Sequence, residues 1–366
     1  MLGIILFIAA ILISIMLHEF GHFATARAFG MKVEEFFVGF GPKLWSFRRG
    51  DTEYGAKAIP LGGYVRIAGM NPFEDPKPED EGRTYKSKSH WQRAVVLTAG
   101  SFMHFVIAVI ILIGIFAFAG VRGDPTTVLS EVVEGTPAAA ADLRSGDRLV
   151  EIAGQPIQGW TDVQRIVSAR PGEQIEIVVE RDGELVQLEA TPATTERDGE
   201  QVGYLGVGPD FEKIKRSIPA ATVESIQEVG RGAKASLEAF VNLFSPDSLG
   251  RLFSVASGRS ERSVEDPATL VGVGGQAGNF ANTGNWLAFF SLIAAFNIFI
   301  GVANLVPLPP LDGGHLAVVV YEKIRGKEAD MRKLVPVSLT VIMILGSMFM
   351  LLLYLDIVKP LPDLAR

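Results

Sequence analysis

Four stretches of this 366-residue chain are long and apolar enough to cross a lipid bilayer as helices. A hydrocarbon core about 30 Å thick needs about 20 apolar residues per helix. The stretches cover residues 2–24, 94–120, 286–306 and 334–355, and Glu19 is their only Asp, Glu, Lys or Arg. They predict a polytopic α-helical membrane protein with about four transmembrane helices. The first stretch is expected to be retained, because no positive region precedes it as in a signal peptide.

The overall composition indicates a sizeable part outside the bilayer. Hydrophobic residues make up 48% of the chain and charged residues 20%, and the mean hydropathy is +0.28. A net charge of -7 without a long basic run argues against nucleic-acid binding. The chain has no cysteine, which excludes disulfides and thiolate metal ligands.

The first apolar stretch ends in an H-E-x-x-H motif, His18-Glu19-Phe20-Gly21-His22. On a helix the two histidines lie four residues apart on one face and can hold one zinc ion, with Glu19 beside it as a general base. A carboxylate within a membrane helix costs roughly 2.5 to 3.5 kcal/mol and usually serves function. The alternative is that these side chains only hydrogen-bond between packed helices.

A third metal ligand is expected near the end of the third apolar stretch. Residues 304–314 read N-L-V-P-L-P-P-L-D-G-G, and their prolines and glycines must break a helix. Irregular backbone at membrane depth is tolerated where it lines a protein cavity. Asp312 and His315 are both candidate ligands, and spacing alone does not choose between them.

The two motifs together resemble the site-2 protease family of intramembrane zinc metalloproteases. The resemblance implies that His18, His22 and Asp312 bind one Zn²⁺ and that Glu19 activates the attacking water. It also implies that Asn304 holds the substrate backbone or the oxyanion. Zinc rather than another divalent ion rests on this precedent, since His and carboxylate ligands suit several metals. The alternative is a zinc transporter or a metal-dependent membrane scaffold, and a catalytically silent PDZ adaptor fits less well.

As a member of that family the protein would be a zinc metalloendopeptidase acting in regulated intramembrane proteolysis. Its substrates would be single-span membrane proteins, such as anti-sigma factors or remnant signal peptides, cut within the transmembrane segment. One departure lies in the second apolar stretch, where Ser101 and His104 replace the Pro and Asn of the family pattern. His104 is left without an assigned role, either structural or as a metal ligand.

The connection after the first helix resembles the family's membrane-associated β-loop. Gly39, Gly41, Gly62, Gly63 and Tyr64 are expected to bind an extended substrate at a sheet edge. The alternative is an ordinary glycine-bounded hairpin without a substrate role. Residues 71–88, rich in Pro and charge, are expected to form a mobile loop.

Orientation is predicted from lysine and arginine next to the helix ends, which favour the cytoplasm. In the first and third connections these are Arg27, Lys32, Lys43, Arg48, Arg49, Lys86, Lys88, Arg93, Lys323, Arg325, Lys327, Arg332 and Lys333. Both connections are therefore expected to be cytoplasmic, with both termini outside. The protein is expected in a bacterial cytoplasmic (inner) membrane, with the metal motif toward the cytoplasmic side.

Residues 124–209 resemble a PDZ domain, with strands at 175–179 and 185–190 and a short helix at 161–169. This extracytoplasmic domain is expected either to bind a peptide or substrate ectodomain or to act as a spacer that excludes bulky ectodomains. Four segments are predicted. Residues 1–120 contain the first two membrane helices and the β-loop, and 124–209 form the PDZ-like domain. Residues 210–285 form an extracytoplasmic helix and linker, and 286–366 contain the last two membrane helices. Within 210–285 we expect an amphipathic helix at 218–244 and a flexible loop at 249–263.

Overall fold

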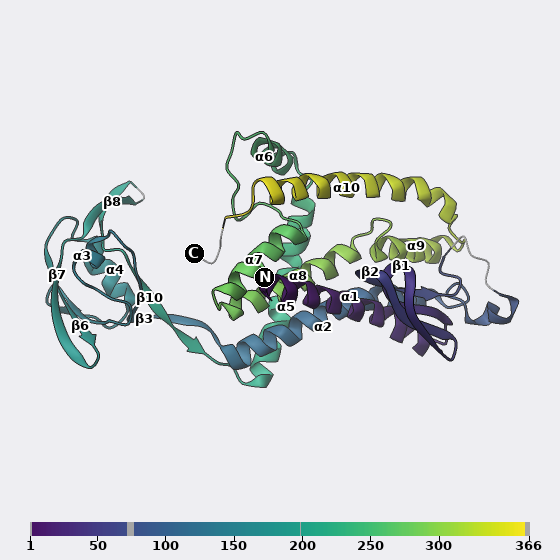
Figure 1. Cartoon of the computed structure of the whole chain (residues 1–366), viewed down its shortest axis with the longest axis horizontal. Helices are drawn as coiled ribbons and strands as arrows, with labels where there is room; N and C mark the ends of the chain where they lie inside the picture. The colour runs from purple at the N-terminus through teal and green to yellow at the C-terminus, as the bar shows by residue number, and fades with distance from the viewer. Residues whose placement is uncertain (1, 72–76, 198, 363–366) are drawn as a thin grey trace. The chain divides into compact units, whose positions relative to one another are not determined.

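The computed structural model describes residues 2–71, 77–197 and 199–362, and it divides into two units. The first consists of Met1–Ala117 with Ser217–Arg366, and the second of Phe118–Arg216. The first unit contains the apolar helices, and the second is built mainly of β-strands (Figure 1).

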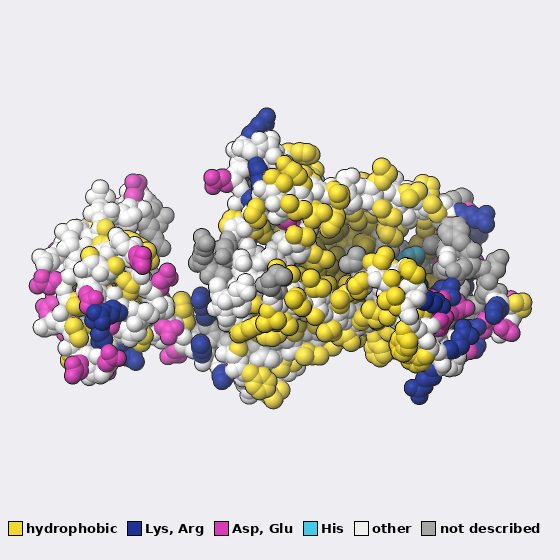
Figure 2. All heavy atoms as spheres, viewed as in Figure 1, with side chains coloured by type: hydrophobic (Ala, Val, Ile, Leu, Met, Phe, Trp, Pro, Cys, Tyr) yellow, Lys and Arg dark blue, Asp and Glu magenta, His cyan; other side chains and the backbone are white. Residues whose placement is uncertain are grey.

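Four helices of the described residues are long and apolar enough to span a membrane, as predicted. They are α1 (Leu2–Ala28), α2 (His90–Gly114) with its continuation to Ala119, α8 (Trp286–Leu305) and α10 (Val335–Val358). Helix α2 packs against both α1 and α8 (Figure 1). On the face that Figure 2 shows, apolar side chains cover the middle of this unit and charged side chains gather at one end, as expected for a protein that is partly solvated by lipid.

Glycines allow α1 and α2 to cross at close range. A Cβ at Gly21, inside the H-E-x-x-H motif, would lie 2.5 Å from the carbonyl oxygen of Ala99. A Cβ at Gly100 would lie 2.7 Å from Cε1 of both His18 and His22. Small residues at helix crossings are the usual means of bringing membrane helices together. The crossing thus places the backbone of α2 directly against the motif histidines.

The connection between α1 and α2 contains a long antiparallel hairpin, β1 (Val33–Arg49) and β2 (Thr52–Ile67). The expectation of a mobile loop at 71–88 is wrong for the described part, 77–88, and residues 72–76 lie outside the described residues. Pro78–Arg83 form a short 3₁₀ helix. The buried Asp80 accepts a hydrogen bond from Lys32 Nζ at 2.5 Å, and Tyr85 is buried. These contacts order a segment whose composition predicted mobility.

Along the chain, three further helices follow the β-strand unit and precede α8. Helix α5 (Ile218–Asn242) matches the predicted amphipathic helix, and α7 (Leu270–Asn282) packs against α1. The expectation of a flexible loop at 249–263 is wrong in its first half, which belongs to α6 (Pro246–Ala256). The Ser245 hydroxyl caps α6 by accepting a hydrogen bond from Ser248 N, and Leu252 and Val255 are buried beneath it.

The last membrane helix, α10, is held at its C-terminal end by a buried ion pair. Asp356 Oδ1 accepts a hydrogen bond of 2.6 Å from Arg262 Nη2, and Oδ2 accepts one of 2.7 Å from Thr269 N, just before α7. The Asp356 and Arg262 side chains are 0% and 3% exposed. After the irregular segment that follows α8, α9 (Asp312–Arg325) and a 3₁₀ turn at Met331–Leu334 lead into α10.

The second unit is an antiparallel sheet with strand order β10-β3-β4-β6-β7. Its strands are β3 (Val121–Val132), β4 (Arg148–Ile152), β6 (Ile175–Arg181), β7 (Glu184–Ala190) and β10 (Val207–Ile214), and β5 (Gln155–Pro156) pairs with β4. Strands β8 (Ala193–Arg197) and β9 (Glu200–Tyr204) form a separate hairpin. The short helices are α3 (Pro137–Ala140) and α4 (Trp160–Ser168).

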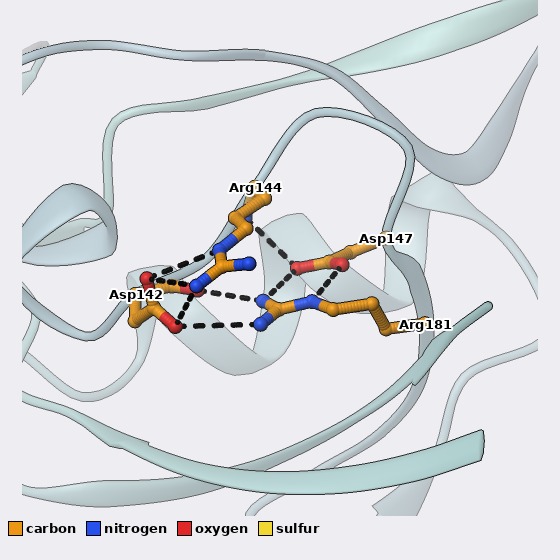
Figure 3. Close-up of polar contacts among 4 residues, drawn as sticks. All are labelled: Asp142, Arg144, Asp147 and Arg181. Carbon is orange, nitrogen blue, oxygen red and sulfur yellow. Dashed lines mark hydrogen bonds and ion pairs between the residues drawn. The ribbon is translucent and has the colours of Figure 1, made fainter.

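Alternating burial explains how the sheet closes a core. Ile175, Ile177 and Val179 are buried, whereas Glu176 between the first two and Glu180 after the last are exposed. A polar cluster joins Arg181, at the end of β6, to Asp142, Arg144 and Asp147 in the loop before β4 (Figure 3). Arg181 donates from Nε and Nη2 to the two carboxylate oxygens of Asp147, both at 2.8 Å.

Candidate metal centre

Helix α1 positions the two motif histidines so that both rings point to one place. His18 and His22 are 8% and 5% exposed, and their Nε2 atoms lie 3.1 Å apart. His22 Nδ1 lies 2.7 Å from the Val96 carbonyl oxygen of α2 and donates its proton there. Because Nδ1 carries the proton, Nε2 has a lone pair available. A metal-binding histidine usually has this arrangement. His18 Nδ1 is buried without a hydrogen-bond partner among the described residues.

Asp312 comes to the same place from the other end of the chain. It is the first residue of α9, so its carboxylate also benefits from the positive end of that helix. Gly313 and Gly314 follow it, where a side chain would overlap the backbone of residues 305–309. Asp312 Oδ2 lies 3.3 Å from Nε2 of His18 and 3.3 Å from Nε2 of His22.

The three ligand atoms fit a tetrahedral zinc ion. Zinc bonds to imidazole nitrogen and carboxylate oxygen at about 2.0–2.2 Å, which places the ligands of a tetrahedral site about 3.3–3.6 Å from one another. The observed separations of 3.1, 3.3 and 3.3 Å are close to this spacing. Asp312 Oδ2 is buried and accepts no hydrogen bond from the described residues. A buried carboxylate oxygen with that environment calls for a cation.

A cleft of about 260 Å³ opens beside these ligands. Glu19, Asn304 and His104 share its wall with two of the ligands; its lining is Ile15, His18, Glu19, His104, Ile300, Asn304, Pro310, Leu311 and Asp312. The structure therefore brings Glu19 and Asn304, both predicted from the sequence, to one cleft. His315, the competing ligand candidate, instead lines a second small cavity with Arg93 and Glu322.

The predicted β-loop residues divide into two groups. A Cβ at Gly63 would lie 3.5 Å from Cγ of Glu19, and one at Gly62 would lie 3.9 Å from Ile15, so both glycines face α1. Gly39 and Gly41 instead lie against Ile59 of β2, within the hairpin.

Tyr64 is occupied by other partners. Its hydroxyl accepts a hydrogen bond of 2.5 Å from Lys57 Nζ and donates one to Glu35, and its ring stacks on Phe37. Among the described residues that line the cleft, none is a β-loop residue. Of the five predicted β-loop residues, Gly62 and Gly63 are therefore the two whose positions face Ile15 and Glu19 of α1.

Two residues that the sequence did not single out also shape the site. Gly100 leaves the space that the rings of His18 and His22 occupy, and Asn297 of α8 hydrogen-bonds His104 at 2.9 Å. A glycine and an asparagine within apolar helices are weak signals, since many such residues only assist helix packing. Their importance depends on which helices meet, which the sequence does not give.

Comparison with known proteins assigns the family. A family model described as peptidase family M50 matches residues 6–351. The chain belongs to peptidase family M50. This is the site-2 protease family that the sequence motifs indicated, and the protein is a zinc metalloprotease.

Among similar M50 proteins is zinc metalloprotease Rip1 of Mycobacterium tuberculosis (strain H37Rv). It is 36% identical over 408 residues, which cover 98% of each chain. Metalloprotease MmpA of Caulobacter vibrioides is 35% identical over 88% of this chain and 87% of its own. Among solved structures, the PDZ domain of an SdrC-like protein from Listeria monocytogenes matches 24% of this chain and 90% of that one, with 21% identity and a TM-score of 0.20.

Proposed function

We propose that this M50 protease cleaves single-span membrane proteins within their transmembrane segments. The observation that carries the proposal is the position of the His18, His22 and Asp312 cluster, with Glu19 beside it, in the unit that contains the four apolar helices. A hydrolytic cleft between such helices has a natural substrate in another membrane helix. The lipid bilayer would therefore surround the protease and also contain its substrates.

The residues divide the reaction among them. His18, His22 and Asp312 would hold one zinc ion, which when bound would acidify a water molecule and act as a Lewis acid toward the peptide carbonyl. Glu19 accepts the proton of the attacking water and can pass it to the departing amine. Asn304, on the same cleft, donates a hydrogen bond to the carbonyl oxygen as negative charge develops there.

An apolar cavity of about 1050 Å³ supports approach of the substrate from within the membrane. It lies between α5, α8 and α10 and extends to residues 305–308, just before the segment that carries Asp312. Its walls are almost wholly hydrocarbon, including Phe105, Phe240 and Ile344. A transmembrane helix is a suitable occupant, and its local unwinding would carry the peptide bond to the cleft.

We also propose the orientation that the lysine and arginine distribution predicts. The β1–β2 hairpin and the connection after α9 lie on the cytoplasmic side of a bacterial inner membrane, and the β-strand unit lies outside. Accessibility of single cysteines introduced at Lys43 and Glu184 to an impermeant reagent tests this. Labelling of Lys43→Cys from outside intact cells contradicts the orientation.

In the β-strand unit, a cleft of about 230 Å³ lies between α4 and residues 202–207, beside the edge strand β10. We propose that this PDZ-like unit selects substrates by binding an extended segment there. Gln164, an exposed residue of α4, lines the cleft. The variant Gln164→Trp fills it and should reduce cleavage of substrates with an extracytoplasmic tail. Unchanged cleavage would favour a unit that acts only as a steric spacer.

The central test is cleavage by purified protein in liposomes, with a tagged single-span substrate and bound zinc measured in parallel. The variant Glu19→Gln should retain zinc and lose cleavage, because the amide cannot accept the proton. The variants His22→Ala and His315→Ala form a matched pair. The first should lose zinc and activity, and the second should retain zinc. Cleavage by Glu19→Gln at the wild-type rate, or full zinc in His22→Ala, would refute the proposed roles.

A further inference from the structure

The cleft contains a histidine that is not one of the proposed zinc ligands. His104 of α2 is 2% exposed and lines the cleft with Glu19, Asn304 and Asp312. The centre of its ring lies 5.1 Å from that of His18. It does not belong to the cluster of His18, His22 and Asp312, the group of possible metal ligands found among the described residues.

Neighbouring groups fix the orientation and the proton of the His104 ring. Its Nδ1 lies 2.9 Å from Oδ1 of Asn297, and Nδ2 of Asn297 donates to the Ile293 carbonyl oxygen at 2.9 Å. The second bond orients the amide, so its oxygen faces the ring and accepts the Nδ1 proton. Gly301 lets α8 approach, since a Cβ there would lie 3.2 Å from Cβ of His104. Asn297 is fully buried, so this pairing is shielded from water.

The consequence is an imidazole whose other nitrogen, Nε2, presents a lone pair. A neutral histidine that donates from Nδ1 can only accept at Nε2. Nε2 has no hydrogen-bond partner among the described residues. Because His104 lines the cleft, this lone pair is available there to a ligand that carries a hydrogen-bond donor.

An extended peptide supplies that donor. Its backbone presents N–H and C=O groups, and neither finds water in the hydrocarbon core. Asn304, on the same cleft, can donate to a carbonyl oxygen, whereas His104 can only accept. The two side chains are therefore complementary to the two kinds of backbone group.

We propose that His104 Nε2 accepts a hydrogen bond from a backbone N–H of the substrate near the scissile bond. This inference rests on the proposed function, because it requires an unwound membrane segment in the cleft. His104 is then a catalytic residue in the sense that it touches substrate, and Asn297 is a positioning residue that sets its tautomer.

Backbone ester substitution tests the hydrogen bond directly. Synthetic single-span substrates would carry one ester in place of an amide at successive positions around the mapped cleavage site, which removes one N–H at a time. Each is compared with the all-amide parent in liposomes, using wild type, His104→Leu, His104→Gln and the control Phe102→Leu. Phe102 lies on the same helix and is 63% exposed. Bound zinc is measured for every variant.

The expected result is coupling between one ester position and His104. At that position the ester should lower kcat/KM of wild type and Phe102→Leu about 10-fold, which is about 1.4 kcal/mol. It should have no further effect in His104→Leu, and His104→Gln should retain part of the coupling through its amide oxygen. An Asn297→Leu variant should weaken the coupling without loss of zinc.

Two results would overturn the proposal. Equal ester effects in wild type and His104→Leu at every position would show that His104 contacts no substrate N–H. Loss of zinc in His104→Leu would make it part of the metal site. Cleavage of the all-amide parent by wild type keeps both results distinct from failure of the proposed function.

Discussion

Gly100 is the residue whose replacement by alanine should damage the metal centre most specifically. It lies on α2, opposite His18 and His22. As a glycine it has no side chain that could hydrogen-bond to them. The change Gly100→Ala adds one methyl group to a helix interior, where alanine is favoured over glycine. Any loss of function must therefore arise from the position of that methyl group.

The size of the effect follows from the geometry. The added Cβ would lie 2.3 Å from Nε2 of His22 and 2.7 Å from Cε1 of His18, whereas ordinary van der Waals contact begins at 3.4 Å. The difference requires the His22 ring to retreat by about 1.1 Å and the His18 ring by about 0.7 Å, or the two helices to separate. A displacement of about 1 Å at a catalytic site can cost about 100-fold in rate. We expect a loss of this order, together with weaker zinc binding.

The assay compares zinc content and cleavage of a tagged single-span substrate in liposomes. The matched control is Gly114→Ala, the same change on the same helix, where no atom lies within 4 Å of the added Cβ. The control should keep wild-type zinc and turnover. Wild-type zinc and turnover in Gly100→Ala would refute the close packing of α2 on the histidines.

Two further predictions concern buried ion pairs. Burial alone would raise the pKa of Asp147, but hydrogen bonds from Arg181 hold it below its usual range. The stability that this pair adds to the β-strand unit is thus present above about pH 3.9 and lost as pH falls further; Asp147→Ala should remove about 2 kcal/mol, measured by hydrogen exchange at neutral pH. Asp356→Asn should destabilise the C-terminal end of α10 by about 3 kcal/mol, because Arg262 stays buried. The double change Asp356→Leu with Arg262→Met should recover much of that loss, and no recovery would contradict the assignment.

The sequence predicted the parts of the molecule that are governed by local pattern. The apolar stretches match α1, α2, α8 and α10 to within a few residues. The helix-breaking residues at 304–314 indicate that a third metal ligand lies nearby, and they leave both Asp312 and His315 as candidates. Only the family resemblance favours Asp312. The structure separates the two candidates clearly, since α9 turns them toward different cavities.

What the sequence did not predict depends on contacts between distant segments. The 77–88 segment is ordered because Lys32 pairs with Asp80, and Tyr85 is buried. Its polar composition gave no sign of either contact. Gly100 and Asn297 likewise acquire their roles only when α2 crosses α1 and α8. Helix crossings are set by packing over the whole unit, and the pattern of a single sequence does not specify which helices cross.

The proposed ligands come from opposite ends of the chain, with His18 and His22 on the first helix and Asp312 near the start of α9. A ribosome makes the N-terminal part first, so the emerging chain has two histidines and a general base long before it has the aspartate. Nascent or prematurely ended chains would hold metal weakly and lack hydrolytic power. With these ligands, proteolytic competence would be postponed until the segment after α8 has been made.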